Sequence, residues 1–317
     1  NSAHLANVGG FLEKIDPSHP DVLRLVLHPK WISVHPFTLA LTACMGAYCR
    51  VKGGMIVASK IPKHNSTRYL ARMGLFNTLG IDAGIAITEH EASGRFIPLT
   101  QIRTAADLKS AITDLVPLLH APKHVADPIR YVFSELGRNV LEHASSEVGA
   151  FVCAQYYQRS NRIAIGIADA GVGIRSTIAA HHTAKTDAAG IRLALQPGVT
   201  GTTSRIGGTE FNAGAGLFFT KSIAALSRNL FVIYSGDAAY KLLRTPTTKP
   251  IELNPDPAVD RHRDLSVPAW RGTAIGIDMS VEETVEFSSL LNDIRQAYSI
   301  DVGAKKKAYY KKIQFRP

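Results

Sequence analysis

The sequence has few cysteines and no long apolar run, and both shortages limit what the protein can be. Its three cysteines, Cys44, Cys49 and Cys153, are an odd number and form no CxxC pair. A disulfide framework and a cysteine zinc site are therefore disfavoured, and a reducing, cytoplasmic location is expected. The most apolar stretch, residues 37–49, is 13 residues long, whereas a membrane-spanning helix needs about 20 apolar residues. No membrane insertion is expected.

The composition is that of an ordinary globular protein with an excess of positive charge. Hydrophobic residues make up 45% and charged residues 20% of the 317 residues, which excludes disorder over the whole chain and leaves room for about two domains. The net charge is +10. Residues 301–317 form a basic tail, which suits contact with nucleic acid or an anionic surface, although a solvated end has the same composition. Its cations are Lys305, Lys306, Lys307, Lys311, Lys312 and Arg316.

Residues 1–100 predict a small α/β domain, because short apolar strands alternate with helices along them. The helical periodicity falls at residues 37–51 and 66–79, and Asn65 or Ser66 is suited to cap the second helix. The expected strands are residues 22–28, 55–58, 84–88 and 95–99.

Residues 101–300 have a different pattern, in which helices are grouped with strands that favour antiparallel pairing. Two strands, residues 149–158 and 162–168, are separated by a polar turn and predict a hairpin. Five prolines within residues 246–268 predict a long loop. An α+β sandwich is therefore expected rather than a doubly wound sheet. The remaining elements are helices at 104–119, 127–144 and 214–227, and strands at 230–235, 239–243 and 273–279.

Three polar residues follow one face of the helix expected at residues 127–144. Glu135, Asn139 and His143 are spaced four residues apart, so they lie in a row along that face. Apolar residues cover the adjacent face, which places the row at the border of the core, where it would look into a cavity. An amphipathic helix whose polar row meets water has the same periodicity, so the spacing alone leaves both interpretations open.

An aspartate and two glycines follow the strand at residues 162–168. Asp169, Gly171 and Gly173 form a DxGxG pattern, in which the glycines allow the backbone to approach a ligand closely. An ionised aspartate only accepts hydrogen bonds and therefore suits an exocyclic amine. A plain turn after the strand is the alternative for this segment alone.

Two further glycines, Gly214 and Gly216, open the helix expected at residues 214–227, and Leu217 follows them. A glycine-rich helix start exposes free backbone N–H groups, and the helix dipole favours an anion there. The segment therefore predicts a phosphate-binding loop, unless it is a simple helix start. It is neither a P-loop, since no Gly-Lys-Ser/Thr follows, nor a Rossmann fingerprint.

Four segments resemble, in their order and spacing, the GHKL superfamily of ATP-binding domains. These segments are the helix with Asn139, the DxGxG segment, the glycine-rich helix start and a later Gly272-Thr273. That superfamily includes gyrase, the histidine kinases and MutL, with the anti-sigma-factor kinases beside them. The resemblance covers about residues 120–290 and implies a Bergerat-type α/β sandwich, with a mixed, mostly antiparallel sheet and helices on one face. Residues 178–213 match the position of the superfamily's ATP lid.

The resemblance implies a role for each matching residue. Glu135 matches the acid that activates the nucleophile, which is water in ATPases and the acceptor in kinases, and Asn139 matches the asparagine that holds Mg²⁺ at the phosphates. Asp169 matches the acceptor of the adenine amine, and Thr273 matches a threonine near the adenine. Lys221 is expected to be a surface charge. The other matches are Gly171 and Gly173 under the nucleotide, Gly214, Gly216 and Leu217 at the phosphates, and His143 in a structural role.

The implied function is that of an Mg-ATP-binding protein that acts as a nucleotide-dependent switch, a protein kinase or an ATPase, with ATP and Mg²⁺ as cofactors. Two alternatives stay open: an ATP-binding module without turnover, and a nucleic-acid-associated clamp ATPase that uses the basic tail. Clamp members of the superfamily carry a further domain with a catalytic lysine, for which the sequence after residue 300 has little room. A homodimer is compatible with each of these functions.

Residues 1–100 carry a second, weaker resemblance. Ile61-Pro62 and the run from Tyr69 to Phe76 resemble STAS-like regions that are fused to bacterial ATP-binding proteins of this kind. Such regions bind partners and rarely carry catalysis. The resemblance therefore implies a partner-binding or sensory domain ahead of the ATP-binding domain at residues 101–300. An unrelated small α/β cap fits the same residues.

Overall fold

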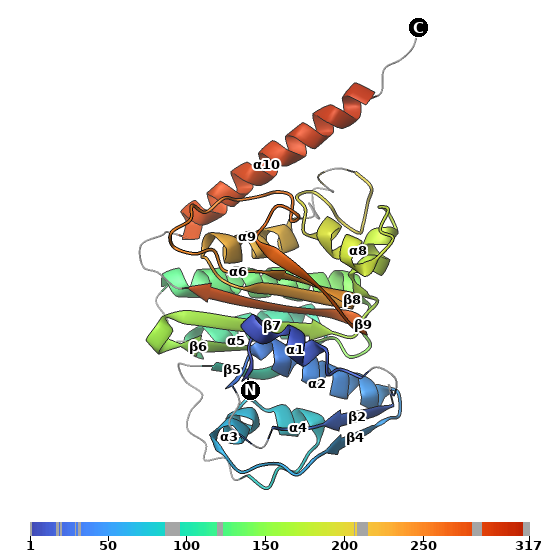
Figure 1. The fold of residues 1–317 in the computed structure, drawn as a ribbon, viewed down its shortest axis with the longest axis vertical. Coiled ribbons are helices and arrows are strands. Elements are labelled where there is room, and N and C mark those ends of the chain that lie inside the picture. The colour runs from blue at the N-terminus through green and yellow to red at the C-terminus, as the bar shows by residue number, and fades with distance from the viewer. Residues whose placement is uncertain are drawn as a thin grey trace.

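A five-stranded antiparallel sheet lies at the centre of the fold (Figure 1). The computed structural model describes residues 2–16, 19, 21–28, 30, 33–85, 96–118, 123–205, 207, 215–280 and 287–312. Every neighbouring pair in this sheet is antiparallel, so the α+β class expected from the sequence is confirmed. In order across the sheet, the strands are β5 (Phe96–Ile102), β6 (Ala150–Tyr157), β7 (Arg162–Asp169), β9 (His262–Ser280) and β8 (Phe231–Leu242).

The chain before β5 forms a smaller group of helices and two short parallel strand pairs. One pair joins β1 (Ser2–Ala3) to β3 (Ser33–Val34), and the other joins β2 (Val22–Leu25) to β4 (Met55–Ala58). The helices in this part are η1 (Leu5–Asn7), α1 (Gly9–Leu12), α2 (Pro36–Val51), α3 (Asn65–Arg72) and α4 (Leu75–Leu79).

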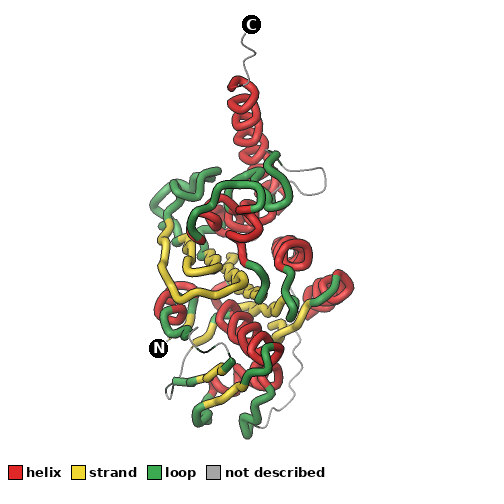
Figure 2. Tube along the Cα trace, turned by 90° about the vertical axis from the view of Figure 1, so that its right-hand side faces the viewer, coloured by secondary structure: helices red, strands yellow, loops and turns green. Residues whose placement is uncertain are grey.

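The longest helix of the described residues, α10 (Phe287–Lys312), projects from the body, at the end of the molecule opposite β2 and β4 (Figures 1 and 2). Helix α6 (Lys123–Asn139) continues as one π-helical turn, η2 (Val140–Ala144). Such turns are rare and are frequent at functional sites. The remaining helices are α5 (Ala105–Leu118), η3 (Gln158–Ser160), α7 (Gly173–Ala179), α8 (Asp187–Ala194) and α9 (Gly216–Leu226).

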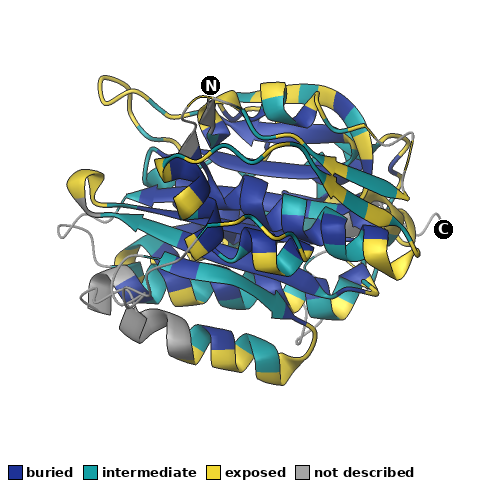
Figure 3. Cartoon of the chain, turned by 90° about the horizontal axis from the view of Figure 1, so that it is seen from below, coloured by how far each residue is buried: buried dark blue, intermediate teal, exposed yellow. Residues whose placement is uncertain are grey.

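Both faces of the central sheet are covered by helices, whereas the sequence analysis expected helices on one face. Along β7, Ile163, Ile165 and Ile167 belong to one core, together with residues of α6 and α9. Ala168 belongs to a second core, together with residues of α2. Because successive side chains of a strand point to opposite faces, a strand that is apolar throughout needs a layer on each side. Figure 3 shows the buried positions gathered in these inner layers.

Helix α2 approaches β7 closely because β7 carries a glycine there. A side chain at Gly166 would collide with the backbone of Pro36 and Phe37 at the start of α2. His35 caps this helix start, since its Nδ1 accepts from the Phe37 N–H at 3.0 Å, and this leaves its Nε2 to donate to Asp278 Oδ1 on β9 at 3.3 Å. Both close packing and a buried polar contact therefore hold α2 against the sheet.

Most of the expected elements are present, and the differences fall at glycines and prolines. The β6–β7 hairpin and the strand at residues 55–58 are confirmed. The helix expected at residues 66–79 is interrupted at Gly74, whose φ of +80° separates α3 from α4. Of the strand expected at residues 84–88, residues 86–88 lie outside the described set.

In the second half of the chain, the expected pair of strands at 230–235 and 239–243 is one strand, β8, with irregular pairing around Gly236. The proline-rich loop ends earlier than expected, because β9 begins at His262 and includes Pro268. Pro268 fits into the strand because the β8–β9 register shifts at this point, where no ladder hydrogen bond is required of it. The basic tail is helical as far as Lys312.

We expect Gly166→Ala to lower the free energy of unfolding by about 1–3 kcal/mol, because the added methyl group forces α2 away from β7. Gly303→Ala is the control. A side chain there meets nothing within 4 Å, and alanine in a helix interior is more stable than glycine by roughly 0.5–1 kcal/mol. Urea unfolding followed by circular dichroism measures both. Equal stabilities for the two variants would contradict the close approach of α2.

Candidate functional site

A cavity of about 310 Å³ lies between α6, the turn after β7, β9 and the start of α9. Gly171 is part of the turn that borders it but is not among its lining residues, and Gly214 lies outside the described residues. The expected site residues that line the cavity are Glu135, Asn139, His143, Asp169, Gly173, Gly216, Leu217 and Thr273. Residues from separate parts of the sequence therefore meet around one space.

Asp169 is the last residue of β7, and it is only 2% exposed. Its Oδ1 accepts hydrogen bonds from Gly171 N at 2.8 Å and Thr273 N at 3.3 Å. Burial raises the pKa of Asp169 to about 6, although these two hydrogen bonds and the charge of Arg271 act in the opposite direction. The carboxylate is thus an acceptor held almost out of water, at the wall of the cavity.

The glycines after Asp169 let the turn pass beneath the π-helical turn η2. A side chain at Gly171 would collide with the carbonyl of Ala144, and the next residue donates its N–H to that same carbonyl at 2.8 Å. Gly173 has a φ of +77°, which favours glycine. Ser235 Oγ accepts from Ile174 N at 3.0 Å and lies 2.9 Å from the Gly272 carbonyl. The turn is therefore tied to η2, β8 and β9 at once.

Glu135 and Asn139 lie one helical turn apart on α6 and both face the start of α9. A side chain on Gly216 would lie 2.8 Å from Glu135 Oε2 and 3.4 Å from Asn139 Nδ2. Burial raises the pKa of Glu135, with Arg138 lowering it and Glu142 raising it further. Among the described residues, Asn139 Nδ2 is buried with no hydrogen-bond partner. A buried polar group without a partner is rare in folded proteins, so this donor is a candidate to bind an acceptor at the start of α9.

The start of α9 is suited to hold an anion. The helix runs from Gly216 to Leu226, and within the described part of the chain no side chain caps its N-terminus. The first N–H groups of such a helix are free of intrahelical partners, and the helix dipole favours negative charge near them. Gly216 and Leu217 line the cavity at this point, which agrees with their expected position.

Part of the segment expected to be the ATP lid, residues 178–213, is helical, because α8 lies within it. Thr186 caps α8, its Oγ1 accepting from the Ala189 N–H at 3.1 Å. This Thr-Asp sequence was a helix signal that the sequence analysis did not use. Thr200 lines the cavity, and its carbonyl lies 3.0 Å from His182 Nε2. Residues 206 and 208–213 lie outside the described set.

The apolar walls of the cavity were not identified from the sequence. They come from β7, α7, β9, the end of α8 and the segment after it, and periodicity marks such residues only as core positions. They become a ligand wall because the strands and helices that carry them meet beside Asp169. The wall residues include Ile167, Ile174, Ile178, Ala194, Val199 and Ile275.

Lys221, which was expected to be a surface charge, is fully buried at 0% exposure. Its Nζ donates to Asp260 Oδ2 at 2.6 Å and to the Asn254 carbonyl at 3.0 Å. Tyr240 donates to the same carboxylate oxygen at 2.8 Å. The lysine therefore anchors the proline-rich loop to α9, and it is not among the residues that line the cavity.

No known protein-family model matches this sequence, and a search of curated proteins found no match. Within the described residues, no group of three or more His, Cys, Asp or Glu side chains is arranged to hold a metal ion. None of the helices in those same ranges combines the length and apolarity needed to cross a bilayer. The function must therefore be argued from the geometry and chemistry of the cavity.

We expect Asp169→Asn to raise the free energy of unfolding at about pH 8, because the wild type keeps an ionised carboxylate out of water. The folded-state pKa is raised from 3.8 to about 6, so the folded protein binds this proton more tightly than the unfolded chain does. Wild-type stability therefore falls as pH rises from about 4 to about 7, by on the order of 3 kcal/mol. Chemical unfolding over this pH range measures the difference.

Asp237→Asn, at an exposed position on β8, is the matched control and should follow the wild-type profile. If the wild type and Asp169→Asn keep a constant difference in stability across the whole range, the carboxylate does not carry the expected burial cost.

Proposed function

We propose that this protein binds Mg-ATP in the cavity beside Asp169 and acts as a nucleotide-dependent switch or phosphotransferase of the GHKL type. One observation carries the proposal. A single cavity brings together a buried carboxylate, apolar walls, an acid–amide pair on α6 and the start of α9, which no side chain of the described residues caps. Its volume of about 310 Å³ is at the lower end of the range typical of small-molecule sites, about 300–1,000 Å³.

The carboxylate and the apolar walls suit an adenine ring. Both backbone hydrogen bonds to Asp169 fall on Oδ1, which leaves Oδ2 as the acceptor for an exocyclic amine. Isoleucine side chains such as Ile174 and Ile275 line the same space and give a flat ring an apolar surface. Thr273, whose N–H donates to Asp169 Oδ1, is proposed to act as the adenine-side threonine of the superfamily.

The start of α9 and the side chains of α6 suit the phosphates. Free N–H groups of α9 would bind phosphate oxygens. Asn139 Nδ2 is a buried donor without a partner among the described residues and would suit a phosphate oxygen, while the amide oxygen of the same side chain, with several waters, would be a suitable environment for Mg²⁺. Bound there, Mg²⁺ would neutralise charge on the phosphates. One protein ligand is consistent with the lack of a larger ligand cluster in the described ranges.

Glu135 is proposed as the general base. It would take a proton from water, or from an acceptor hydroxyl, as that oxygen bonds to the γ-phosphorus and ADP leaves. Burial raises its pKa, and a carboxylate with a raised pKa is a better base near neutral pH. A module that binds ATP without turnover is the alternative, and it has no need of a desolvated acid here.

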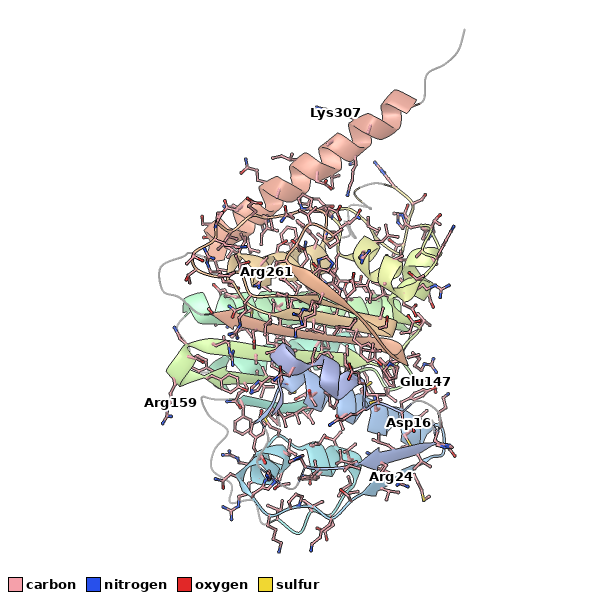
Figure 4. All side chains as sticks on the ribbon, viewed as in Figure 1. Asp16, Arg24, Glu147, Arg159, Arg261 and Lys307 are labelled. Atoms are coloured by element: carbon pink, nitrogen blue, oxygen red, sulfur yellow. The ribbon has the colours of Figure 1, made fainter. Side chains whose placement is uncertain are left out.

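The antiparallel sheet with α6 and α9 on the cavity side supports the Bergerat-type arrangement. The STAS-like role of the N-terminal elements, a protein partner for them, a homodimer and the domain boundaries at residues 100 and 300 stay predictions. Contact of the basic tail with nucleic acid is a prediction as well. Lys307 lies on the projecting part of α10 (Figure 4), so such a contact would not require the cavity.

We expect the wild type to bind ATP in preference to GTP, because guanine presents a carbonyl where adenine presents an amine. Asp169→Asn should weaken ATP binding at least tenfold, since a charged acceptor is worth roughly 1.5–3 kcal/mol, and should reduce the preference. Wild-type affinity should also fall as pH drops through about 6. Titration calorimetry measures all three effects, with Asp237→Asn as control. No ATP binding by the wild type would sink the proposal.

We expect Glu135→Gln to keep ATP affinity within a few-fold but to lower turnover by roughly 10²–10⁴, because it removes a general base and leaves the binding groups in place. The assay follows γ-labelled ATP with Mg²⁺ and records whether the label ends in free phosphate or in an acceptor. Asp127→Asn, a partly exposed carboxylate on the same helix, is the control. If ATP binds to the wild type and the label never leaves it, the protein is a binding module without turnover.

A further inference from the structure

Arg271, on β9, bridges helix α2 and the turn that carries Asp169. Its Nε donates to the Gly171 carbonyl at 3.3 Å, and its Nη1 donates to Tyr48 Oη at 2.5 Å. The guanidinium also lies over the Tyr48 ring, 4.8 Å from the centroid. One planar group therefore contacts both the helix that covers one face of the sheet and the turn that borders the cavity.

Trp270, the neighbouring residue, makes a parallel connection. Its Nε1 donates to the Asp169 carbonyl at 3.0 Å. Its ring meets the Tyr48 ring edge to face, with 6.1 Å between centroids. Two consecutive residues of β9, Trp270 and Arg271, thus donate to the carbonyls of Asp169 and Gly171. Tyr48 contacts both Trp270 and Arg271.

The backbone of β9 encloses the same turn. A side chain on Gly173 would lie 2.7 Å from the Arg271 carbonyl, and one on Gly272 would collide with the Asp169 carbonyl. Because neither glycine position has room for a side chain, a small movement of β9 at Arg271 is transmitted directly to the turn. The hydrogen bonds of Trp270 and Arg271 to the turn act together with this close packing of the backbone.

The charged and titratable groups around Asp169 come from three sides. Arg271 on β9 is the cation that lowers the pKa of Asp169. Cys44 on α2 is fully buried, and this burial raises the pKa of its thiol, with the charge of Asp169 raising it further. Across the cavity, α6 and η2 contribute Glu135, Glu142 and His143. Arg271 is therefore the side chain whose charge favours the ionised form of Asp169, in addition to the backbone hydrogen bonds from Gly171 and Thr273.

We infer that Arg271 is a positioning residue for the candidate nucleotide site, and that Tyr48 of α2 acts on Asp169 through it. The inference deepens the proposed function and rests on it for the identity of the ligand. Arg271 is not among the residues that line the cavity. It orients the turn from behind, and through the turn it positions Asp169 as an acceptor for the base.

The connection gives the N-terminal elements a route to the site. Tyr48 lies near the end of α2, where Lys52 pairs with Glu147 at 2.9 Å (Figure 4 labels Glu147). A molecule that displaces Tyr48 from Arg271 would loosen the turn and lower nucleotide affinity. By thermodynamic reciprocity, nucleotide would weaken the binding of that molecule by the same factor.

The test compares the wild type with Arg271→Gln, Arg271→Lys and Tyr48→Phe, and uses Lys52→Gln as control. Lys52 lies over the same Tyr48 ring, 5.5 Å from its centroid, but does not contact the turn. Two measurements are made on each variant. Calorimetry gives ATP affinity between about pH 5 and pH 8, and amide hydrogen exchange without nucleotide gives the protection of residues 169–173.

Arg271→Gln should weaken ATP binding at about pH 8 roughly tenfold, because a charge-assisted contact to the turn is lost. It should also move the pH midpoint of binding upward and speed exchange in residues 169–173. Arg271→Lys should keep the midpoint near that of the wild type, because the charge stays, but should still speed exchange, because a point donor does not replace the planar fork. Tyr48→Phe should speed exchange and weaken binding by a smaller factor. Lys52→Gln should match the wild type.

The inference would be overturned if Arg271→Gln had the same ATP affinity, the same pH midpoint of binding and the same amide exchange in residues 169–173 as the wild type. Wild-type behaviour of Tyr48→Phe alone would overturn the link to α2. If the wild type does not bind ATP but Arg271→Gln still speeds exchange in the turn, the proposed function fails and the positioning role of Arg271 stands. The exchange measurement therefore separates failure of the function from failure of the inference.

Discussion

The burial of a carboxylate at the end of β7 is the constraint on which the rest of this structure depends. β7 runs between two apolar cores, so Asp169 leaves the sheet with 2% of its surface exposed. An ionised group in such a place needs hydrogen bonds, and two backbone N–H groups supply them. Those donors are in place only because Gly171 lets the turn fold beneath η2. Gly171, the π-helical turn above it and Thr273 of the closing strand thus all help to hold one buried charge.

The two layers beside the sheet contribute differently to the site. On one face, α6 and α9 form the cavity together with the turn. On the other face, α2 reaches the back of the same turn through Tyr48, Arg271 and Trp270. The sheet is therefore more than a support for the cavity, because a displacement of α2 has a direct physical path to the carboxylate.

Local patterns predicted those parts of the fold that local forces decide. The polar row of Glu135, Asn139 and His143 follows from helical spacing, and the β6–β7 hairpin follows from two apolar runs around a polar turn. The break at Gly74 was missed, and at Gly236 a break was expected where β8 is one strand with irregular pairing, because a glycine inside a periodic run signals an interruption only when its backbone conformation is known. Lys221 was misplaced because its partner, Asp260, lies far along the chain. No periodicity reports a pairing of that kind.

The sequence by itself determined the α+β class, the antiparallel hairpin and the polar and glycine residues of the candidate site, because each of these depends on spacing within one segment. Only the tertiary structure decided that the sheet is covered on both faces, that isoleucines from separate elements form the cavity walls, and that Arg271 joins α2 to the Asp169 turn. These features depend on close packing between segments that are distant in sequence. Whether a glycine such as Gly166 or Gly171 is required is decided by the backbone that lies against it, and the order of residues alone does not contain that information.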